Sequence, residues 1–292
     1  MSQIQAASNP ISWKDYYELC KPNVVFLMLL TSVIGMLLAT PVMVPLEILI
    51  FGNVGIGLCA GAAAAVNHLV DRHIDTKMAR TFNRPVATGR VDVKHALLFA
   101  FVIGSLGMAI LLAVTNPLTA WLTLASLLGY AVVYTMFLKR ATPQNIVIGG
   151  IAGAAPPLLG WVAVTGSVDA YALLLVLIIF AWTPPHFWAL AVHRKAEYAN
   201  AEIPMLPVTH GDQYTRLHIL LYTLILTAVT LLPFATGMSG YIYLAGAVLL
   251  NIGFLYWAVV LYMGKPVGMK TFKYSIWYLM ALFIFMLTDH YI

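Results

Sequence analysis

Three polar residues recur at four-residue intervals near the end of an apolar stretch: Asn67, Asp71 and Asp75. In a helix, residues four apart lie on one face, a turn above one another, so these side chains are expected to project together. Like charges at this spacing destabilise an isolated helix by about 0.2–0.5 kcal/mol. A bound cation relieves that repulsion, and oxygen ligands suit Mg²⁺. We therefore predict a catalytic magnesium site held by Asp71 and Asp75 with Asn67 beside them; the alternative is a polar helix end.

A cluster of basic residues follows this motif within one loop. Arginine donates paired hydrogen bonds that match phosphate oxygens, and Mg²⁺ commonly binds phosphate groups. Together the acids and the cations predict a site that holds a diphosphate at the edge of a membrane. The alternative role of such cations is to orient the protein and to contact anionic lipid. The predicted diphosphate-binding residues are Arg72, Lys77, Arg80, Arg84 and Arg90.

The composition indicates what kind of protein must position these residues. Of 292 residues, 61% are hydrophobic and only 9% are charged, whereas soluble domains carry about 25% charged residues. The chain is therefore predicted to be a polytopic membrane protein. Basic cytoplasmic loops explain the net charge of +5, which gives no reason to expect nucleic-acid binding. Cys20 and Cys59 are far apart and indicate neither a disulfide nor a metal site.

Long stretches without charged residues are the candidates for membrane helices, which need about 20 residues each. Two of these stretches are long enough for two helices, divided at Asn116-Pro117 and at residues 236–240. We predict an all-α protein in which residues 1–292 form a single transmembrane domain with nine helices. The predicted helices cover approximately residues 24–40, 48–72, 96–114, 118–138, 145–164, 170–193, 217–236, 241–263 and 272–288.

The basic residues test this helix count through the positive-inside rule. With nine helices, all sixteen Lys and Arg residues fall on one side of the membrane, whereas the opposite loops carry Glu47 and Asp169. A wrong count would mix the two sides. We infer that the C-terminus lies outside the cytoplasm. The cytoplasmic segments are then the N-terminal residues 1–22 and the long loops 73–95 and 194–216.

Two predicted helices each contain a double proline: Pro156-Pro157 in the fifth and Pro184-Pro185 in the sixth. Proline removes a backbone donor and clashes with the preceding turn. In lipid, such a break persists only where the freed carbonyls find partners or line a cavity. The pairs therefore predict interruptions beside a widened chamber between the second, fifth and sixth helices. A simple packing kink is the alternative.

A second polar group lies at the end of the sixth helix: His186, His193, Arg194, Lys195 and Glu197. His186 and His193 are seven residues apart and so share a helix face. A histidine in a membrane helix either binds a ligand or hydrogen-bonds a carbonyl at a kink, and the two cations also fit ordinary loop residues. The residues alone do not decide between these roles.

These motifs resemble the UbiA superfamily of intramembrane prenyltransferases, and within it the branch that acts on heme. The resemblance extends from Lys21-Pro22 to the end of the ninth helix. Quinone-type members carry a second acid-rich motif after the sixth helix, whereas residues 193–198 here keep one acid, Glu197, as in the heme branch. The segments that carry the resemblance are 67–75, 80–89, 153–157, 184–191 and 198–208.

The resemblance implies helices bundled around a central cavity and transfer of a farnesyl group from farnesyl diphosphate to a vinyl group of heme b, with addition of water. Heme b is then a substrate, and magnesium is held by Asp71 and Asp75, with Glu197 as a candidate third ligand. The implied heme contacts are the iron ligands His186 or His193, and Arg194, Lys195 or Lys139 beside the propionates.

The resemblance further implies a bacterial cytoplasmic membrane, contact with membrane lipid, and delivery of the product to a heme A synthase or a terminal oxidase assembly. Two other functions stay open at this point. One is an aromatic prenyltransferase of quinone biosynthesis, and the other is a non-catalytic membrane heme carrier. A secondary transporter is disfavoured, because the polar residues gather at one edge of the membrane rather than at its midplane.

Overall fold

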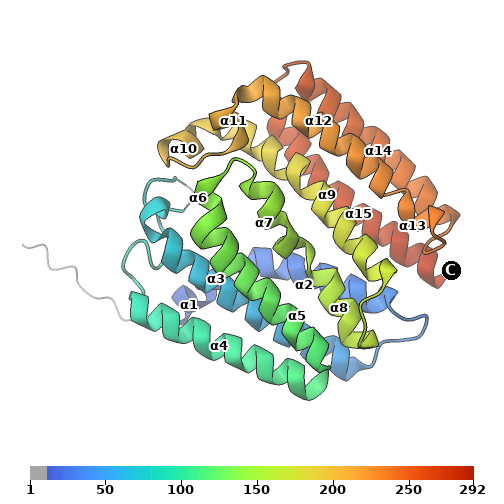
Figure 1. The fold of residues 1–292 in the computed structure, drawn as a ribbon, viewed down its shortest axis with the longest axis horizontal. Coiled ribbons are helices and arrows are strands. Elements are labelled where there is room, and N and C mark those ends of the chain that lie inside the picture. Colours follow the sequence, from blue (N-terminus) through green and yellow to red (C-terminus); the bar gives the residue numbers. More distant parts are fainter. Residues whose placement is uncertain (1–11, 80) are drawn as a thin grey trace, which may run out of the picture.

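The computed structural model describes residues 12–79 and 81–292, and every regular element in these ranges is a helix (Figure 1). Within these ranges eight helices are long and apolar enough to cross a membrane, and the count is nine if the bent pair α1 (Trp13–Leu19) and α2 (Pro22–Leu38) is taken as one span. The other spans are η1–α3 (Ile48–Gly52, Asn53–Asp75), α4 (Val93–Val114), α5–η2 (Pro117–Leu128, Gly129–Leu138), α7–α8 (Asn145–Ala154, Pro156–Thr165), α9 (Ala170–His193), α12–α13 (Gly211–Val229, Leu232–Ala235), α14 (Tyr241–Tyr262) and α15 (Gly268–Tyr291).

The predicted all-helical membrane fold is confirmed, and nearly all helix ends lie within four residues of their predicted positions. The exception is α12, which begins at Gly211 rather than near residue 217. Polar residues continue this helix beyond the apolar core, so hydropathy alone places its start too late. The segment predicted as the loop 194–216 therefore contains two short helices, α10 (Lys195–Asn200) and α11 (Leu206–Thr209), and the first turns of α12.

The two double prolines have different effects. Pro156-Pro157 divides the fifth span at Ala155, between α7 and α8, as predicted. The predicted interruption of the sixth span is wrong, because α9 continues through Pro184-Pro185. Side chains support this stretch: the Thr183 hydroxyl donates to the Ile179 carbonyl at 2.7 Å, and the Trp182 indole nitrogen donates to the Ser275 carbonyl at 2.8 Å.

The break between α7 and α8 lets α8 lie directly against α2. A Cβ atom added at Gly35 would be 2.0 Å from the carbonyl oxygen of Pro157, and one at Gly160 would be 2.0 Å from that of Ser32. Only glycine permits this approach of two backbones. On its other side α8 packs on α9, and α9 packs on α12 and α15 (Figure 1). The close approach of α8 to α2 therefore connects α2 to these C-terminal helices.

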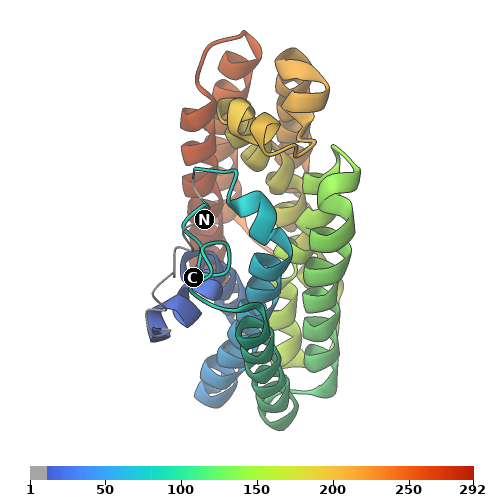
Figure 2. The same ribbon diagram turned by 90° about the vertical axis from the view of Figure 1, so that its left-hand side faces the viewer.

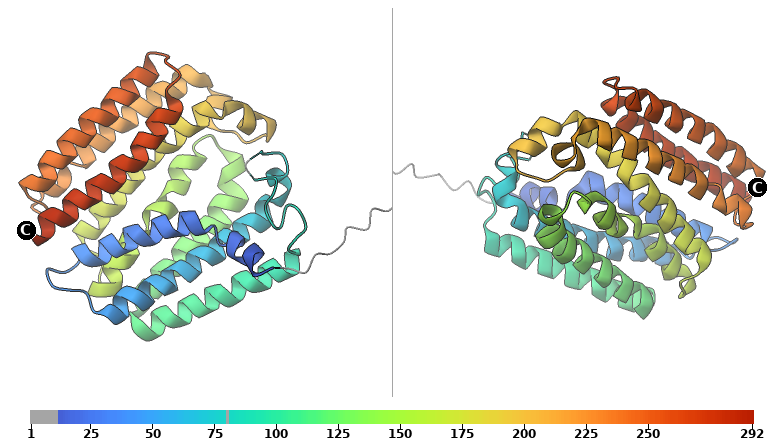
Figure 3. Two further views of the ribbon diagram at one scale, coloured as in Figure 1. Left: turned by 180° about the vertical axis from the view of Figure 1, so that it is seen from behind. Right: turned by 45° about the horizontal axis from the view of Figure 1, so that its top comes forward.

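The loop that follows α3 and the pair α10–α11 lie over the same end of the bundle (Figures 1 and 3). Lys77 and Glu202 join them through an ion pair of 3.0 Å. On its other side the loop is tied to α1, since Arg90 pairs with Asp15 and Glu18. Figure 2 looks onto this end, where α3 and its loop lie between the other helices. The last turns of α3 are thus enclosed by segments from distant parts of the chain.

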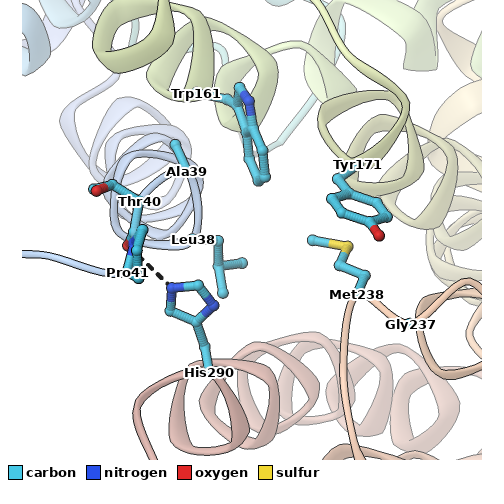
Figure 4. A pocket seen from close by; sticks show the side chains of 9 residues that line it. All are labelled: Leu38, Ala39, Thr40, Pro41, Trp161, Tyr171, Gly237, Met238 and His290. Atoms are coloured by element: carbon cyan, nitrogen blue, oxygen red, sulfur yellow. Dashed lines mark hydrogen bonds between the residues drawn. The ribbon is translucent and has the colours of Figure 1, made fainter.

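A pocket of about 220 Å³ lies at the opposite end of the bundle (Figure 4). Its walls include Trp161, Tyr171 and Met238, and His290 donates from Nε2 to the Thr40 carbonyl at 3.0 Å. None of its lining residues is Asp, Glu, Lys or Arg. This pocket is therefore unsuited to a metal–diphosphate group, and the candidate chemistry lies at the α3 end.

Candidate active site

The last turns of α3 carry the three residues of the motif on a buried face. Asn67, Asp71 and Asp75 are 3%, 1% and 3% exposed. The Asn67 amide nitrogen donates to Asp71 Oδ2 at 2.9 Å and contacts the Thr135 hydroxyl at 3.3 Å. The four-residue spacing therefore stacks the three side chains within the protein rather than toward lipid.

Three cations from different elements contact this column. Nη1 of Arg84, in the loop, donates to both carboxylate oxygens of Asp75 at 2.9 Å. Nζ of Lys139 donates to Asp71 Oδ2, and Nζ of Lys21 donates to Asn67 Oδ1. Buried carboxylates require such partners, because an unpaired charge in an apolar interior is strongly unfavourable.

Irregular backbone positions two of these cations. Lys21 lies at the corner between α1 and α2 in the left-handed region, with φ 50°, which is unusual for a residue other than glycine. Lys139 follows the π-helix η2, in which Thr135 donates to the Tyr130 carbonyl at 2.8 Å. π-helical turns often mark functional sites.

One unpaired carboxylate oxygen makes this site suitable for a divalent cation. Asp71 Oδ1 is buried and has no hydrogen-bond partner, although the other oxygen of this carboxylate is paired. An oxygen ligand is the donor that Mg²⁺ prefers. Across the described residues, no three His, Cys, Asp or Glu side chains are grouped to hold a metal. Glu197 lies 3.6 Å from Arg194 and does not join the two aspartates, so its role as a third ligand stays a prediction.

Other members of the predicted diphosphate set have different partners. Arg72 donates to the Leu69 carbonyl at 2.9 Å, Lys77 pairs with Glu202, and Arg90 pairs with α1 and donates to the Asn83 carbonyl. Arg80 lies outside the described residues. Within the described chain, Arg84 is thus the member of this set that contacts a motif acid.

The predicted heme-binding residues lie along and just after α9. The ring of His186 lies between Trp182 and Phe272, with centroid distances of 4.1 and 4.5 Å, and its Nδ1 is 2.6 Å from the Ser275 hydroxyl. His193 ends α9 beside Gly268, the first residue of α15. Arg194 pairs with Glu197, and Lys195 pairs with Asp212 at 2.9 Å.

The structure also identifies site residues that spacing did not single out: Lys21, Thr135 and Lys139. Lys139 was expected beside the heme propionates, whereas here it pairs with Asp71. The available signals were a lysine at the cytoplasmic end of the fourth span and a Lys-Pro pair before the first. Neither signal shows which residue the lysine contacts, because these contacts join residues 46 and 68 positions apart in the sequence.

This arrangement of acids and cations in a helical membrane bundle defines a class of protein. The signature of the UbiA prenyltransferase family matches residues 28–287, and the chain belongs to this family.

Two relatives are highly similar to this chain over nearly its full length. The chain is 71% identical over 290 residues to a protoheme IX farnesyltransferase of Teredinibacter turnerae, covering 99% of this chain and 93% of the relative. It is 72% identical over 282 residues to one of Saccharophagus degradans, covering 96% and 93%.

Solved structures share the fold at low sequence identity. A structure of digeranylgeranylglyceryl phosphate synthase superposes with a TM-score of 0.81 at 17% identity, covering 95% of this chain and 98% of that one. A UbiA homolog from Archaeoglobus fulgidus, bound to GPP and Mg²⁺, superposes with a TM-score of 0.65 at 16% identity, covering 93% and 99%.

Proposed function

We propose that this protein transfers the farnesyl group of farnesyl diphosphate to a vinyl group of heme b, with addition of water, and so forms heme O and diphosphate. The observation that carries the proposal is the near full-length identity of about 70% to protoheme IX farnesyltransferases. The buried column of Asn67, Asp71 and Asp75 (the acid column) and its cations support the proposal, because the donor's leaving group is a diphosphate. A quinone-type aromatic acceptor and a non-catalytic heme carrier are less well supported.

The charges at the end of α3 suit a magnesium–diphosphate group. Three cations, Lys21, Arg84 and Lys139, surround two carboxylates, Asp71 and Asp75, for a net charge of +1 when all are ionised. A terminal phosphate carries about −1.5 to −2, and the inner phosphate adds about one more negative charge. Magnesium bound by the two aspartates would bring the site to +3 and so balance the donor. When bound, it supplies charge stabilisation for the departing diphosphate.

The chain's residues surround both the diphosphate and the farnesyl group of the donor. The allylic C–O bond of the donor breaks and diphosphate leaves with the electron pair, while Arg84, Lys139 and Lys21 hydrogen-bond its oxygens. The terminal vinyl carbon of heme bonds to the first farnesyl carbon. Positive charge is left on the vinyl carbon attached to the ring, and water adds there and loses a proton. The apolar helix walls exclude further water from the allylic cation.

His186 is our candidate for the heme iron ligand, with His193 as the second. The Ser275 hydroxyl donates to the Phe272 carbonyl at 2.6 Å, so its oxygen accepts from Nδ1–H of His186. That assignment leaves a lone pair on Nε2, and metal-binding histidines usually donate their other N–H in this way. Arg194 and Lys195 would exchange their present carboxylate partners for the propionates.

Replacing His186 tests this assignment. We expect His186→Ala to weaken heme binding about tenfold, because the ligand and its supporting hydrogen bond are both lost. Titration of purified protein with heme, followed by its absorption band, measures the change. His290→Ala, at the opposite end of the bundle, is the matched control and should bind heme normally. An unchanged band and affinity in His186→Ala would remove His186 from the site.

The product identifies the function. Purified protein with Mg²⁺ and farnesyl diphosphate should convert heme b to a product heavier by one farnesyl group and one hydroxyl group, detected by mass spectrometry. It should leave 4-hydroxybenzoate unchanged, and a chelator should abolish turnover until Mg²⁺ is restored. Prenylation of 4-hydroxybenzoate instead would assign the quinone reaction. Heme binding without turnover, indifferent to chelation, would indicate a carrier.

The chain is an integral membrane protein, and we propose the bacterial cytoplasmic membrane as its location. Segregation of all sixteen Lys and Arg residues supports a cytoplasmic N-terminus and a C-terminus on the opposite side. Labelling of a cysteine added at the C-terminus by an impermeant maleimide, in intact cells, tests that orientation. We further propose that a heme A synthase or a terminal oxidase assembly receives the product.

A further inference from the structure

His68 is a buried histidine whose ring has no hydrogen-bond partner. Its side chain lies in α3 directly after Asn67, the residue is 2% exposed, and neither Nδ1 nor Nε2 is paired. A neutral imidazole always has one N–H donor and one acceptor nitrogen, and burying both unpaired is unfavourable. Native proteins rarely retain such a group unless water, an ion or a ligand completes it.

Helical geometry places His68 with the motif acids. It precedes Asp71 by three residues and Asp75 by seven, so the three share one face of α3. Asp71 Oδ1, one turn further along, is also buried and unpartnered. A carboxylate oxygen needs a cation or a donor, and an imidazole N–H needs an acceptor, so a magnesium–diphosphate group would satisfy both.

The neighbouring charges determine what kind of ligand His68 can bind. Lys21 contacts Asn67, the residue before His68, and Arg84 contacts Asp75 on the same face of α3. Two cations close to a neutral N–H donor favour an anionic oxygen as the ligand of His68. The neutral N–H of His68 can donate a hydrogen bond to an anionic oxygen. Unlike a third cation, it would not repel Lys21 and Arg84.

We propose that the N–H of His68 binds an oxygen of the prenyl donor's diphosphate, on the side of Lys21 and deeper in the bundle than Asp71. This inference rests on the proposed function and assigns to the donor site a neutral residue outside the acid column and its cations. His68 then contributes to donor binding and orientation, whereas heme is bound elsewhere.

Three variants separate this role from a structural one. His68→Leu removes both nitrogens and keeps an apolar side chain. His68→Gln keeps an N–H donor at the end of a flexible chain. His73→Leu is the matched control, because His73 is an exposed histidine on the same helix. Each purified protein is melted in Mg²⁺ with and without farnesyl thiodiphosphate, which binds as the donor but is slow to ionise, and KM is measured for both substrates.

We expect the melting temperature of ligand-free His68→Leu to equal or exceed that of the wild type, because an unpaired polar group has been removed. Its stabilisation by farnesyl thiodiphosphate should fall, and its KM for farnesyl diphosphate should rise about tenfold while the KM for heme stays constant. His68→Gln should recover part of the loss, and His73→Leu should match the wild type.

Other outcomes overturn the proposal in distinct ways. A lower ligand-free melting temperature in His68→Leu with normal stabilisation by the analogue would make His68 an ordinary core residue. A raised KM for heme alone would move it to the acceptor side. If the wild type itself gained no stability from the analogue, the proposed function would fail along with this inference, whereas normal wild-type stabilisation confines any failure to His68.

Discussion

Asp71→Asn and Asp75→Asn should each lower the rate of heme O formation about a thousandfold or more. Asparagine keeps the shape of the side chain and removes its charge, so the loss isolates the carboxylate. Removing one preorganised electrostatic contact typically lowers a rate about 10²–10³-fold. Here the same change also removes half of the proposed magnesium ligands, so the larger value is expected. Product is measured by chromatography after expression in a strain that lacks its own heme O synthesis, and with purified protein.

Folding must be measured beside activity in these variants. Asp71 and Asp75 are buried and paired with Lys139 and Arg84, so each substitution leaves a cation without its partner. Breaking a buried ion pair can destabilise a protein by about 3–5 kcal/mol. Rates are therefore compared per folded protein. Asp92→Asn is the control, because Asp92 caps α4 from the same loop and asparagine is an equally good cap.

The control should fold and react like the wild type. Folded Asp71→Asn and Asp75→Asn proteins that retained a tenth of wild-type turnover would contradict both the magnesium site and the mechanism drawn from it.

The sequence predicts the acid column because its geometry is local. Asn67, Asp71 and Asp75 are positioned by the repeat of one helix, and the charge-free stretches define that helix and its neighbours. The same reasoning predicts the all-helical fold and most helix ends. It fails at the start of α12, where a polar helical turn extends beyond the apolar span, and at Pro184-Pro185, where Thr183 and Trp182 support an uninterrupted helix.

The partners of the acids could not be predicted, because they depend on contacts between distant segments. Closeness in sequence favoured the cations of the loop after α3, yet Lys77 pairs with Glu202 and Arg90 with α1. Lys139 reaches Asp71 from 68 residues away, through a π-helix that no periodicity indicated. A loop rich in cations therefore predicts the chemistry of a site better than it predicts which cations form it.

Lys139 provides the second large expected effect. Lys139→Gln should lower kcat/KM for farnesyl diphosphate about a hundredfold, because its ammonium lies beside Asp71 and would bind the departing diphosphate. The KM for heme should change little if the lysine acts on the donor rather than on a propionate. Lys94→Gln, at the exposed start of α4, is the matched control and should leave both constants near wild type.

A double variant distinguishes a shared role from two separate ones. If Lys139 and Asp71 act on one magnesium–diphosphate group, their effects are coupled and not additive. Lys139→Gln combined with Asp71→Asn should then be no slower than Asp71→Asn alone. It should also fold better than Asp71→Asn, because the buried cation left without a partner has been removed. Fully additive losses, or a Lys139→Gln protein with a raised KM for heme only, would return Lys139 to the acceptor side of the site.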